Sequence, residues 1–216
     1  MDTVWRIAAA LAVAFVAGSI PFAVIISRTF FHSDIREHGS GNPGATNVLR
    51  TFGPAAGFAV FALDGLKGAA GVYVARLLVP AAWAADGHDW FMIAAAMAAI
   101  AGHTFSPFIG FKGGKGVATA AGAISIIIPG AFVVMFVTFA VILAITRMVS
   151  LGSIVLALEF PLLTIIMYGD RTPVVLFGFA AGTLVLWRHH ANLKRIFLGQ
   201  EHKMGTNNES REASQA

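Results

Sequence analysis

The clearest candidate for chemistry in this sequence is a short basic segment between two apolar stretches. Residues 111–119 read Phe-Lys-Gly-Gly-Lys-Gly-Val-Ala-Thr, and the candidates within them are Lys112, Gly113, Gly114, Lys115 and Gly116. Two ammonium groups, backbone N–H groups and the positive end of a following helix can converge on one anion. The segment is not a nucleotide P-loop, because Gly116 stands where Ser or Thr would bind magnesium. We expect a phosphate-binding loop; the alternative is a basic loop that only orients the chain in a membrane.

A second polar run lies at residues 39–50, which read Gly-Ser-Gly-Asn-Pro-Gly-Ala-Thr-Asn-Val-Leu-Arg. Its small residues let the backbone approach a ligand closely, and Ser40, Asn42 and Thr46 can donate hydrogen bonds. Arg50 can form a bidentate pair with a phosphate. Asn47 is a candidate for a supporting layer behind these residues. The alternative for this run is an ordinary loop with a helix cap.

A third polar segment, residues 188–201, follows the last apolar stretch. His189 and Asn192 share one helix face, one turn apart, and can present hydrogen-bonding groups together. His190 points to a different face, so a shared metal is not expected, and no other His, Asp and Glu set in the sequence has metal-binding spacing. The alternative is a solvated interfacial helix. Ser150 is a further candidate, either as a ligand contact or as a helix cap.

Polar side chains also occur inside the apolar stretches. Asp64 and Lys67 are three residues apart, so they can pair across one helical turn where a lone charge would be costly. We interpret this pair first as structural support for the loop next to it. His103 lies near the Gly-Lys loop and is a candidate for supporting it. Glu159 has no partner that the sequence identifies.

The composition excludes an ordinary soluble domain. Of the 216 residues, 57% are hydrophobic and 12% charged, with a mean hydropathy of +0.75, whereas soluble domains carry roughly 25% charged residues. The pI of about 9.9 is not accompanied by a basic block, so nucleic acid is not an expected partner. The absence of Cys excludes disulfides and thiolate nucleophiles. The sequence therefore predicts an all-α integral membrane protein.

Six apolar stretches are long enough, or nearly so, to cross a bilayer: 4–27, 53–79, 91–109, 117–146, 151–168 and 173–187. The fourth contains Pro129 and Gly130, so it is either one kinked helix or two helices. Two helices would place eleven of the 15 Lys and Arg residues on one side. The positive-inside rule then favours seven spans, with the N-terminus outside and the C-terminus cytoplasmic. We expect one transmembrane domain over residues 1–204 and a polar, disordered tail over 205–216.

Six motifs together resemble one family. They are Gly-Ser-Ile-Pro (18–21), Ser-Gly-Asn-Pro-Gly-Ala-Thr-Asn (40–47), Asp-Gly-Leu-Lys-Gly (64–68), Gly-His (102–103), Phe-Lys-Gly-Gly-Lys-Gly-Val-Ala-Thr (111–119) and His-His-Ala-Asn (189–192). In these motifs the chain is similar to the bacterial membrane-bound acyl-phosphate:glycerol-3-phosphate acyltransferases, over nearly its whole length before the polar tail.

The resemblance implies an enzyme of the bacterial inner membrane, with seven helices and its active site on the cytoplasmic side. It would acylate the 1-hydroxyl of sn-glycerol 3-phosphate with a long-chain acyl phosphate, giving lysophosphatidic acid and phosphate. No cofactor or metal is implied. Membrane lipid and a peripheral enzyme that produces acyl phosphate are the partners it suggests. The residues carried over by position are Ser40, Asn42, Thr46, Arg50, Lys112, Gly113, Gly114, Lys115, Gly116, Ser150, His189 and Asn192.

The chemistry of an acyl phosphate sets the expected mechanism. Its phosphate is already a good leaving group, so the protein needs mainly to hold two anions together and stabilise an oxyanion. We expect direct transfer without an acyl-enzyme, the N–H groups of Gly113 and Gly114 completing the anion cradle, and His189 mainly orienting glycerol 3-phosphate. The proton acceptor is either His189 or the phosphate of a bound substrate. The competing interpretations are an organic-phosphate transporter and a lipid-sensing subunit that binds without turnover.

Overall fold

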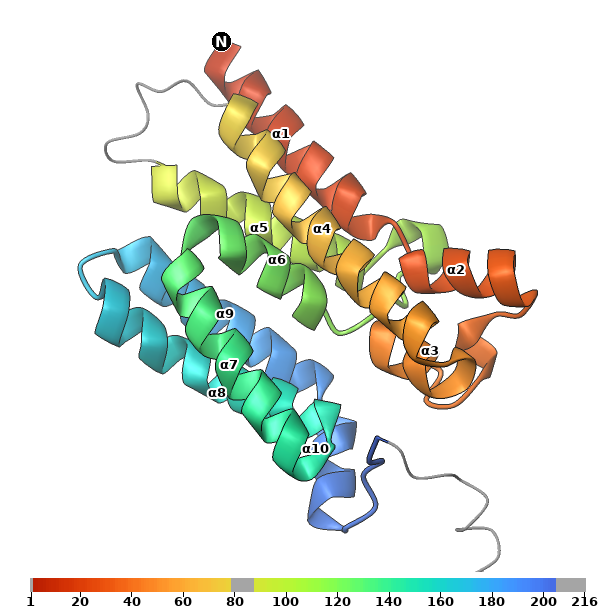
Figure 1. The fold of residues 1–216 in the computed structure, drawn as a ribbon. Coiled ribbons are helices and arrows are strands. Elements are labelled where there is room, and N and C mark those ends of the chain that lie inside the picture. The colour runs from red at the N-terminus through yellow and green to blue at the C-terminus, as the bar shows by residue number, and fades with distance from the viewer. Residues whose placement is uncertain (1, 79–87, 205–216) are drawn as a thin grey trace, which may run out of the picture.

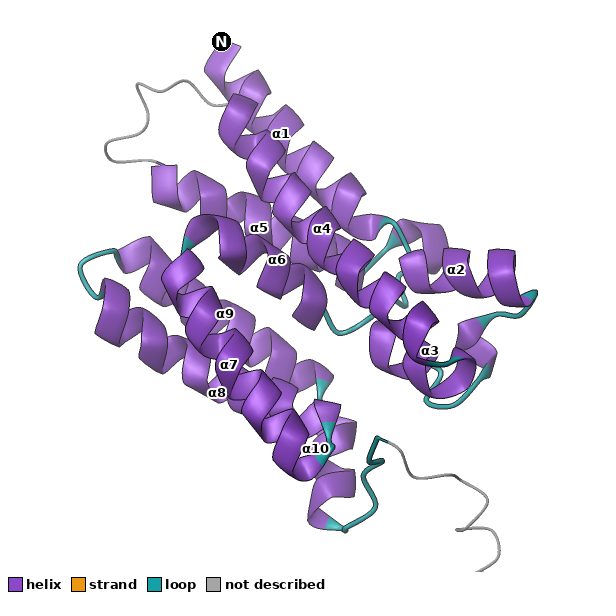
Figure 2. Ribbon diagram, viewed as in Figure 1, coloured by secondary structure: helices purple, strands orange, loops and turns teal. Residues whose placement is uncertain are grey.

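The computed structural model describes residues 2–78 and 88–204, and every regular element within them is a helix (Figure 2). The predicted all-α fold is thus confirmed for the described part of the chain. The segment 205–216, for which the sequence predicts a disordered tail, lies outside the described residues.

The first half of the chain contains α1 (Asp2–Ser19), α2 (Phe22–Phe31), a 3-10 turn (Ile35–Glu37), α3 (Ala45–Phe52), α4 (Pro54–Leu78) and α5 (His88–Thr104). The break between α1 and α2 occurs at Pro21, which has no backbone N–H to continue the helix. Together these two helices form an apolar run of 28 residues, Val4–Phe31. The short α3 carries the second half of the Ser40–Arg50 polar run.

The second half contains a 3-10 turn (Pro107–Ile109), α6 (Val117–Ile127), α7 (Pro129–Thr146), α8 (Val149–Tyr168), α9 (Thr172–Arg188) and α10 (His190–Phe197). The long apolar stretch 117–146 is therefore two helices. Ile128 leaves the helical conformation, with φ −142° and ψ 69°, and Pro129 begins the next helix, a position that proline favours. At the other end, α10 is bent from α9 by 61°.

The helices pack in two groups, as Figure 1 shows. One group consists of α1, α4, α5 and α6, and the other of α7, α8 and α9. Small residues allow backbones to approach closely inside the first group: a Cβ on Gly68 would lie 2.0 Å from the carbonyl oxygen of Thr119, and one on Gly122 would lie 1.9 Å from that of Gly65. The α4–α6 contact is thus a backbone-to-backbone packing of the kind common in membrane bundles.

Helix length separates the candidate membrane spans from the shorter helices. Within the described residues, five helices are long and apolar enough to cross a membrane, and the bent pair α9–α10 is a sixth candidate. The 11 residues of α6 extend about 17 Å, less than the roughly 30 Å of a bilayer core. A multi-pass protein is supported, whereas the seven spans and the orientation of the termini stay predictions.

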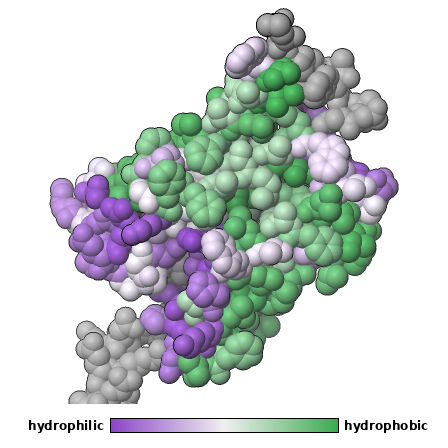
Figure 3. Space-filling model, turned by 180° about the vertical axis from the view of Figure 1, so that it is seen from behind, coloured by the Kyte–Doolittle hydropathy of each residue, from purple (hydrophilic) through white to green (hydrophobic). Residues whose placement is uncertain are grey.

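The surface separates into an apolar side and a polar end. Figure 3 shows hydrophobic residues over most of the lateral face and hydrophilic ones gathered around α3 and α10. On α7, Val133, Phe136 and Val137 are each more than half exposed, as expected of side chains that face lipid. The chemistry predicted from the sequence lies at the polar end.

Candidate active site

Four cationic side chains from separate segments converge at the polar end. Arg50 comes from α3, Lys115 from the loop before α6, Arg188 from the end of α9 and Arg195 from α10; we call them the cation cluster. Burial lowers the pKa of Lys115 to about 8, repulsion from the three arginines adds to the lowering, and the charge of Glu201 opposes it. The resulting excess of positive charge in a partly buried place favours a bound anion such as phosphate.

Glu201 lies inside this cluster, with only 2% of its surface exposed. Its Oε1 accepts hydrogen bonds from Ser150 Oγ at 2.9 Å and Asn192 Nδ2 at 3.0 Å, and its Oε2 accepts one from Arg195 Nε at 2.8 Å. Burial opposes ionisation, but these three hydrogen bonds outweigh it and hold the pKa of Glu201 below its usual value. On its other side, the Asn192 amide oxygen accepts a hydrogen bond from Lys115 Nζ.

The Gly-Lys loop is held in place through the backbone groups of its two glycines. The Gly113 N–H donates to the carbonyl oxygen of Thr104 at 3.1 Å, and the Gly114 N–H donates to that of His103 at 3.2 Å. Arg188 Nη2 donates to the carbonyl oxygens of both glycines, at 2.9 and 3.1 Å. The expectation that these two N–H groups are free to bind an anion is therefore wrong, because both are used to fix the loop.

The two lysines of the loop have different surroundings. Lys115 is partly buried within the cation cluster, whereas Lys112 is exposed, and among the described residues no hydrogen bond or ion pair includes its ammonium. Between the loop and α6, Gly116 caps the helix with φ +80°, a conformation that favours glycine. The structure thus places Lys115, and not Lys112, against Asn192.

The polar run before α3 is organised around Asn47, which is buried. Its Nδ2 donates to the carbonyl oxygens of Ile35 at 3.1 Å and His38 at 2.9 Å, and its Oδ1 accepts from the Ser40 N–H at 3.1 Å. A Cβ on Gly39 would lie 2.4 Å from that same Oδ1. Asn47 therefore ties the start of this run to the preceding 3-10 turn, and its role behind substrate-binding residues stays a prediction.

The other members of this run are more accessible. Ser40 is exposed, while Asn42 and Thr46 are half-buried. Arg50 lies one turn after Thr46 on α3, so the two side chains share a face. Arg50 Nη2 donates to the carbonyl oxygen of His202 at 3.2 Å, and its Nε is buried with no hydrogen-bond partner in the described part of the chain. That unused donor is available to an anion bound in the cluster.

His189 lies at the bend between α9 and α10, and it is buried. Its Nδ1 is 2.8 Å from the carbonyl oxygen of Val185; a carbonyl only accepts, so Nδ1 carries the proton and Nε2 presents a lone pair. Burial lowers the pKa of His189 to about 4, and the charge of Lys115 adds to this. The imidazole is therefore neutral at pH 7. His190 is exposed, and its Nδ1 is 2.8 Å from the carbonyl oxygen of Trp187 at the end of α9.

Asp64, Lys67 and His103 form a buried group beside the Gly-Lys loop. Lys67 Nζ is 2.7 Å from Asp64 Oδ1 and donates to the carbonyl oxygen of Ile20 at 2.7 Å. His103 Nδ1 is 3.6 Å from Asp64 Oδ1, and a Cβ on Gly114 would lie 2.2 Å from His103 Nε2. The group thus abuts the loop from behind. Among the described residues, no set of three or more His, Cys, Asp or Glu side chains is arranged to hold a metal ion.

Sequence reasoning missed three side chains of this site. Arg188 and Arg195 flank the motif that supplied His189 and Asn192, and Glu201 follows it. Arg195 could have been found from its spacing, since it lies three residues after Asn192 on α10 and shares a face with it. Arg188 ends α9, before the bend, so helical spacing does not link it to Asn192. Glu201 carries no such signal, because it lies beyond the end of α10.

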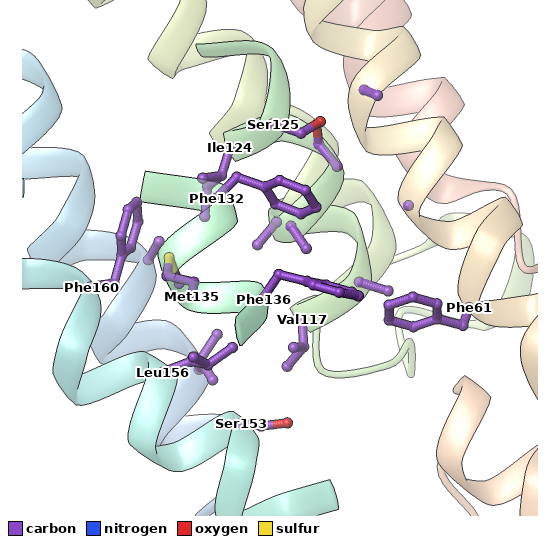
Figure 4. A pocket seen from close by; sticks show the side chains of 18 of the residues that line it. Phe61, Val117, Ile124, Ser125, Phe132, Met135, Phe136, Ser153, Leu156 and Phe160 are labelled. Atoms are coloured by element: carbon purple, nitrogen blue, oxygen red, sulfur yellow. The ribbon is translucent and has the colours of Figure 1, made fainter. Parts of the chain in front are cut away.

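An apolar pocket of about 430 Å³ lies within the helix bundle (Figure 4). It lies between α4 and α6 on one side and α7, α8 and α9 on the other, with Phe61, Phe136 and Phe160 among its walls. Three lining residues adjoin site residues in the sequence: Val117 follows Lys115 by two, Ser153 follows Ser150 by three, and Val185 precedes His189 by four. The pocket therefore continues the polar site into the apolar part of the bundle.

Comparison with known proteins gives a consistent result. A family model described as glycerol-3-phosphate acyltransferase matches residues 8–199. The chain is 43% identical to glycerol-3-phosphate acyltransferase 2 of Moorella thermoacetica over 91% of this chain and 96% of that protein. It is 38% identical to the glycerol-3-phosphate acyltransferase of Halalkalibacterium halodurans, over 91% and 94%.

Two crystal structures of PlsY (YgiH), an integral membrane glycerol 3-phosphate acyltransferase, are similar in fold. The glycerol 3-phosphate form superposes with a TM-score of 0.83 at 35% identity, and the lysophosphatidic acid form with a TM-score of 0.79 at 34% identity. Each match covers 93% of this chain and 96% of the other.

Proposed function

Because the chain belongs to the glycerol-3-phosphate acyltransferase family, we propose that it transfers a fatty acyl group from acyl phosphate to the 1-hydroxyl of sn-glycerol 3-phosphate. The products are 1-acyl-glycerol 3-phosphate (lysophosphatidic acid) and phosphate, in the first step of bacterial phospholipid synthesis. The observation that carries the proposal is that the wall of the apolar pocket includes Val117, two residues from Lys115 of the cation cluster, and Val185, whose carbonyl oxygen is 2.8 Å from His189 Nδ1. A donor with an anionic head and a long apolar tail fits both parts.

The proposed transfer is direct. The 1-hydroxyl oxygen of glycerol 3-phosphate bonds to the carbonyl carbon of the donor, the bond from that carbon to the phosphate oxygen breaks, and the leaving phosphate accepts the hydroxyl proton. Arg50 and Lys115 bind the phosphate groups and stabilise the oxyanion that forms. Ser40, Asn42, Thr46, Ser150 and Asn192 supply hydrogen bonds to the substrates, and Lys112 at the exposed edge of the loop attracts them.

In this mechanism His189 orients glycerol 3-phosphate. Its Nε2 lone pair can accept a hydrogen bond from a glycerol hydroxyl, but a pKa of about 4 makes it a weak proton acceptor. His189→Ala should therefore raise the KM for glycerol 3-phosphate in steady-state kinetics. An unchanged KM with a kcat about a thousandfold lower would instead identify His189 as the general base.

We further propose a place for the enzyme in the cell. A bacterial inner-membrane protein with seven spans, an external N-terminus and a cytoplasmic C-terminus would expose the cation cluster to cytoplasmic glycerol 3-phosphate. The excess of Lys and Arg on one side of the predicted topology supports this orientation. A peripheral enzyme that makes acyl phosphate is then the expected partner, because the long acyl chain of its product favours release at the membrane surface.

The proposed function is tested by comparing two acyl donors. The purified, detergent-solubilised protein is given glycerol 3-phosphate with either palmitoyl phosphate or palmitoyl-CoA, in the presence of a chelator, and lysophosphatidic acid is quantified. Product from palmitoyl phosphate alone is expected. Product from palmitoyl-CoA alone would keep the acyltransferase class but overturn the donor. Product from neither would overturn the proposal, and flux of organic phosphate into liposomes would then test the transporter.

A further inference from the structure

Glu201 is an acidic side chain in a place built for anions, and the mechanism above does not use it. We infer that Glu201 is a positioning residue of the transfer site, whose carboxylate holds Ser150 and Asn192 so that the Asn192 amide oxygen faces the Lys115 ammonium. This inference rests on the proposed function, because it assigns a role within the same site.

A tight turn brings Glu201 into the cluster. Gly199, with φ +66°, follows the C-cap of α10, and its N–H donates to the carbonyl oxygen of Ile196 at 3.0 Å. The following residues, 199–204, cross the site, and we call them the C-terminal strap. The strap is tied on one side by the hydrogen bond from Arg50 to His202 and on the other by the Met204 N–H, which donates to the carbonyl oxygen of Arg147 at 2.8 Å.

The hydrogen bonds of Glu201 determine which way the Asn192 amide points. A carboxylate only accepts, so the Asn192 NH₂ group must face Glu201 and its oxygen must face away from it. That oxygen then meets Lys115 Nζ. A neutral amide at position 201 would remove this constraint, because it offers a donor as well as an acceptor, and Lys115 alone would then hold the Asn192 oxygen in place.

A positioning role and a purely electrostatic role for Glu201 predict opposite changes in the affinity for glycerol 3-phosphate. If Glu201 merely occupied the anion position, removing its charge would leave the cluster more positive and would strengthen the binding of glycerol 3-phosphate. If Glu201 positions Asn192 and Ser150, removing its charge weakens that binding. The direction in which affinity changes therefore separates the two roles.

The charge of Glu201 also reaches Lys115, which gives a second readout. The charged or titratable groups around Lys115 are Arg50 from α3, Arg188 and His189 from the end of α9, Arg195 from α10, and Glu201 from the strap. Of these, Glu201 raises the pKa of Lys115 and the arginines lower it. Without the Glu201 charge, Lys115 loses its proton at a lower pH.

The experiment compares the full-length, detergent-purified protein with Glu201→Gln, Glu201→Asp and the control Glu37→Gln, which changes an exposed glutamate on the 3-10 turn. Binding of glycerol 3-phosphate is measured by calorimetry, without donor, and kcat/KM is measured from pH 6 to 10 with palmitoyl phosphate. Size-exclusion chromatography reports the folded fraction of each variant.

For Glu201→Gln we expect affinity for glycerol 3-phosphate to fall about tenfold to a hundredfold, and the basic limb of the kcat/KM profile to move to lower pH. Glu201→Asp keeps the charge, so its basic limb stays near that of the wild type, and its affinity lies between the two. Glu37→Gln behaves like the wild type.

Tighter binding in Glu201→Gln, or a basic limb that does not move, would overturn the inference. A loss of folded protein with unchanged affinity per folded molecule would do the same, since that is the signature of a strap that only stabilises the fold. If the wild type binds glycerol 3-phosphate but makes no product, the proposed function fails, while the calorimetric comparison still decides the role of Glu201.

Discussion

Removing one partner of the buried Asp64–Lys67 pair should destabilise the protein far more than removing both. The two side chains are 2% and 5% exposed, and their charged atoms are 2.7 Å apart. Lys67→Met would leave the Asp64 carboxylate facing only His103, whose Nδ1 is 3.6 Å away. An uncompensated buried charge costs about 3–5 kcal/mol, and the free energy of unfolding should fall by that amount.

The double variant Asp64→Asn/Lys67→Met contains no uncompensated charge, so its loss should be smaller than the sum of the two single losses. We expect a coupling of about 2 kcal/mol. The free energies of unfolding can be measured by titrating SDS into a mild detergent solution and following helix loss by circular dichroism.

The control uses an ion pair with one exposed member. Arg28 is 61% exposed where it meets Asp34, and Arg36 binds the same carboxylate, so Arg28→Met should cost less than about 1 kcal/mol. Two results would refute this reasoning. One is that the double variant loses as much free energy of unfolding as the two single variants together; the other is that the single variants are as stable as Arg28→Met.

Three further outcomes follow from the site. Asn47→Ala should lower the free energy of unfolding by about 2 kcal/mol, because three backbone groups lose their partner, and thermal denaturation in detergent measures this. Gly114→Ala should lower kcat/KM, because the new Cβ meets His103 Nε2 at 2.2 Å, and the double variant His103→Ala/Gly114→Ala should regain part of it in the same kinetic assay. In the wild type, kcat/KM should fall as pH rises through about 8, where Lys115 loses its proton, as a pH–rate profile will report.

Each of these has a result that contradicts it. Asn47→Ala as stable as the wild type would mean that water replaces its hydrogen bonds. Gly113→Ala is the control for the loop, because its Cβ would meet the His103 carbonyl oxygen at 2.0 Å. His103→Ala cannot remove that backbone atom. If His103→Ala restored the activity of Gly113→Ala as much as that of Gly114→Ala, the steric argument would be rejected. A flat profile up to about pH 9.5 would show that the charge of Lys115 is not needed.

Much of the fold followed from hydropathy and proline placement. The stretch 117–146 was open between one helix and two, and Pro129 decides it because it fits the first position of a new helix. The bend that separates α10 from α9 was not predicted, since the sequence there gives only a polar motif after an apolar run. Such a bend depends on tertiary contacts, which periodicity does not report.

Sequence analysis named most residues of the candidate site, but not the contacts between them. The spacing of Lys112 and Lys115 is symmetric about two glycines, so the sequence could not say which ammonium turns inward; the Asn192 oxygen supplies that asymmetry. Gly113 and Gly114 have N–H groups in any conformation, and only the backbone path shows that Thr104 and His103 use them. Glu201 depends on a turn at Gly199, whose direction no local pattern determines.

The C-terminal strap also sets the order in which the enzyme can be assembled. The helices are synthesised one after another, and about 150 further residues must follow Arg50 before its partner His202 is made. The hydrogen bonds from the cation cluster to Glu201 and His202 cannot form before these two residues have left the ribosome. Every helix of the described chain precedes them. A nascent chain therefore lacks these contacts until synthesis has passed the strap, and a chain cut after α10 would keep all its described helices but lose the hydrogen bonds that link Arg50 and Arg195 to the strap.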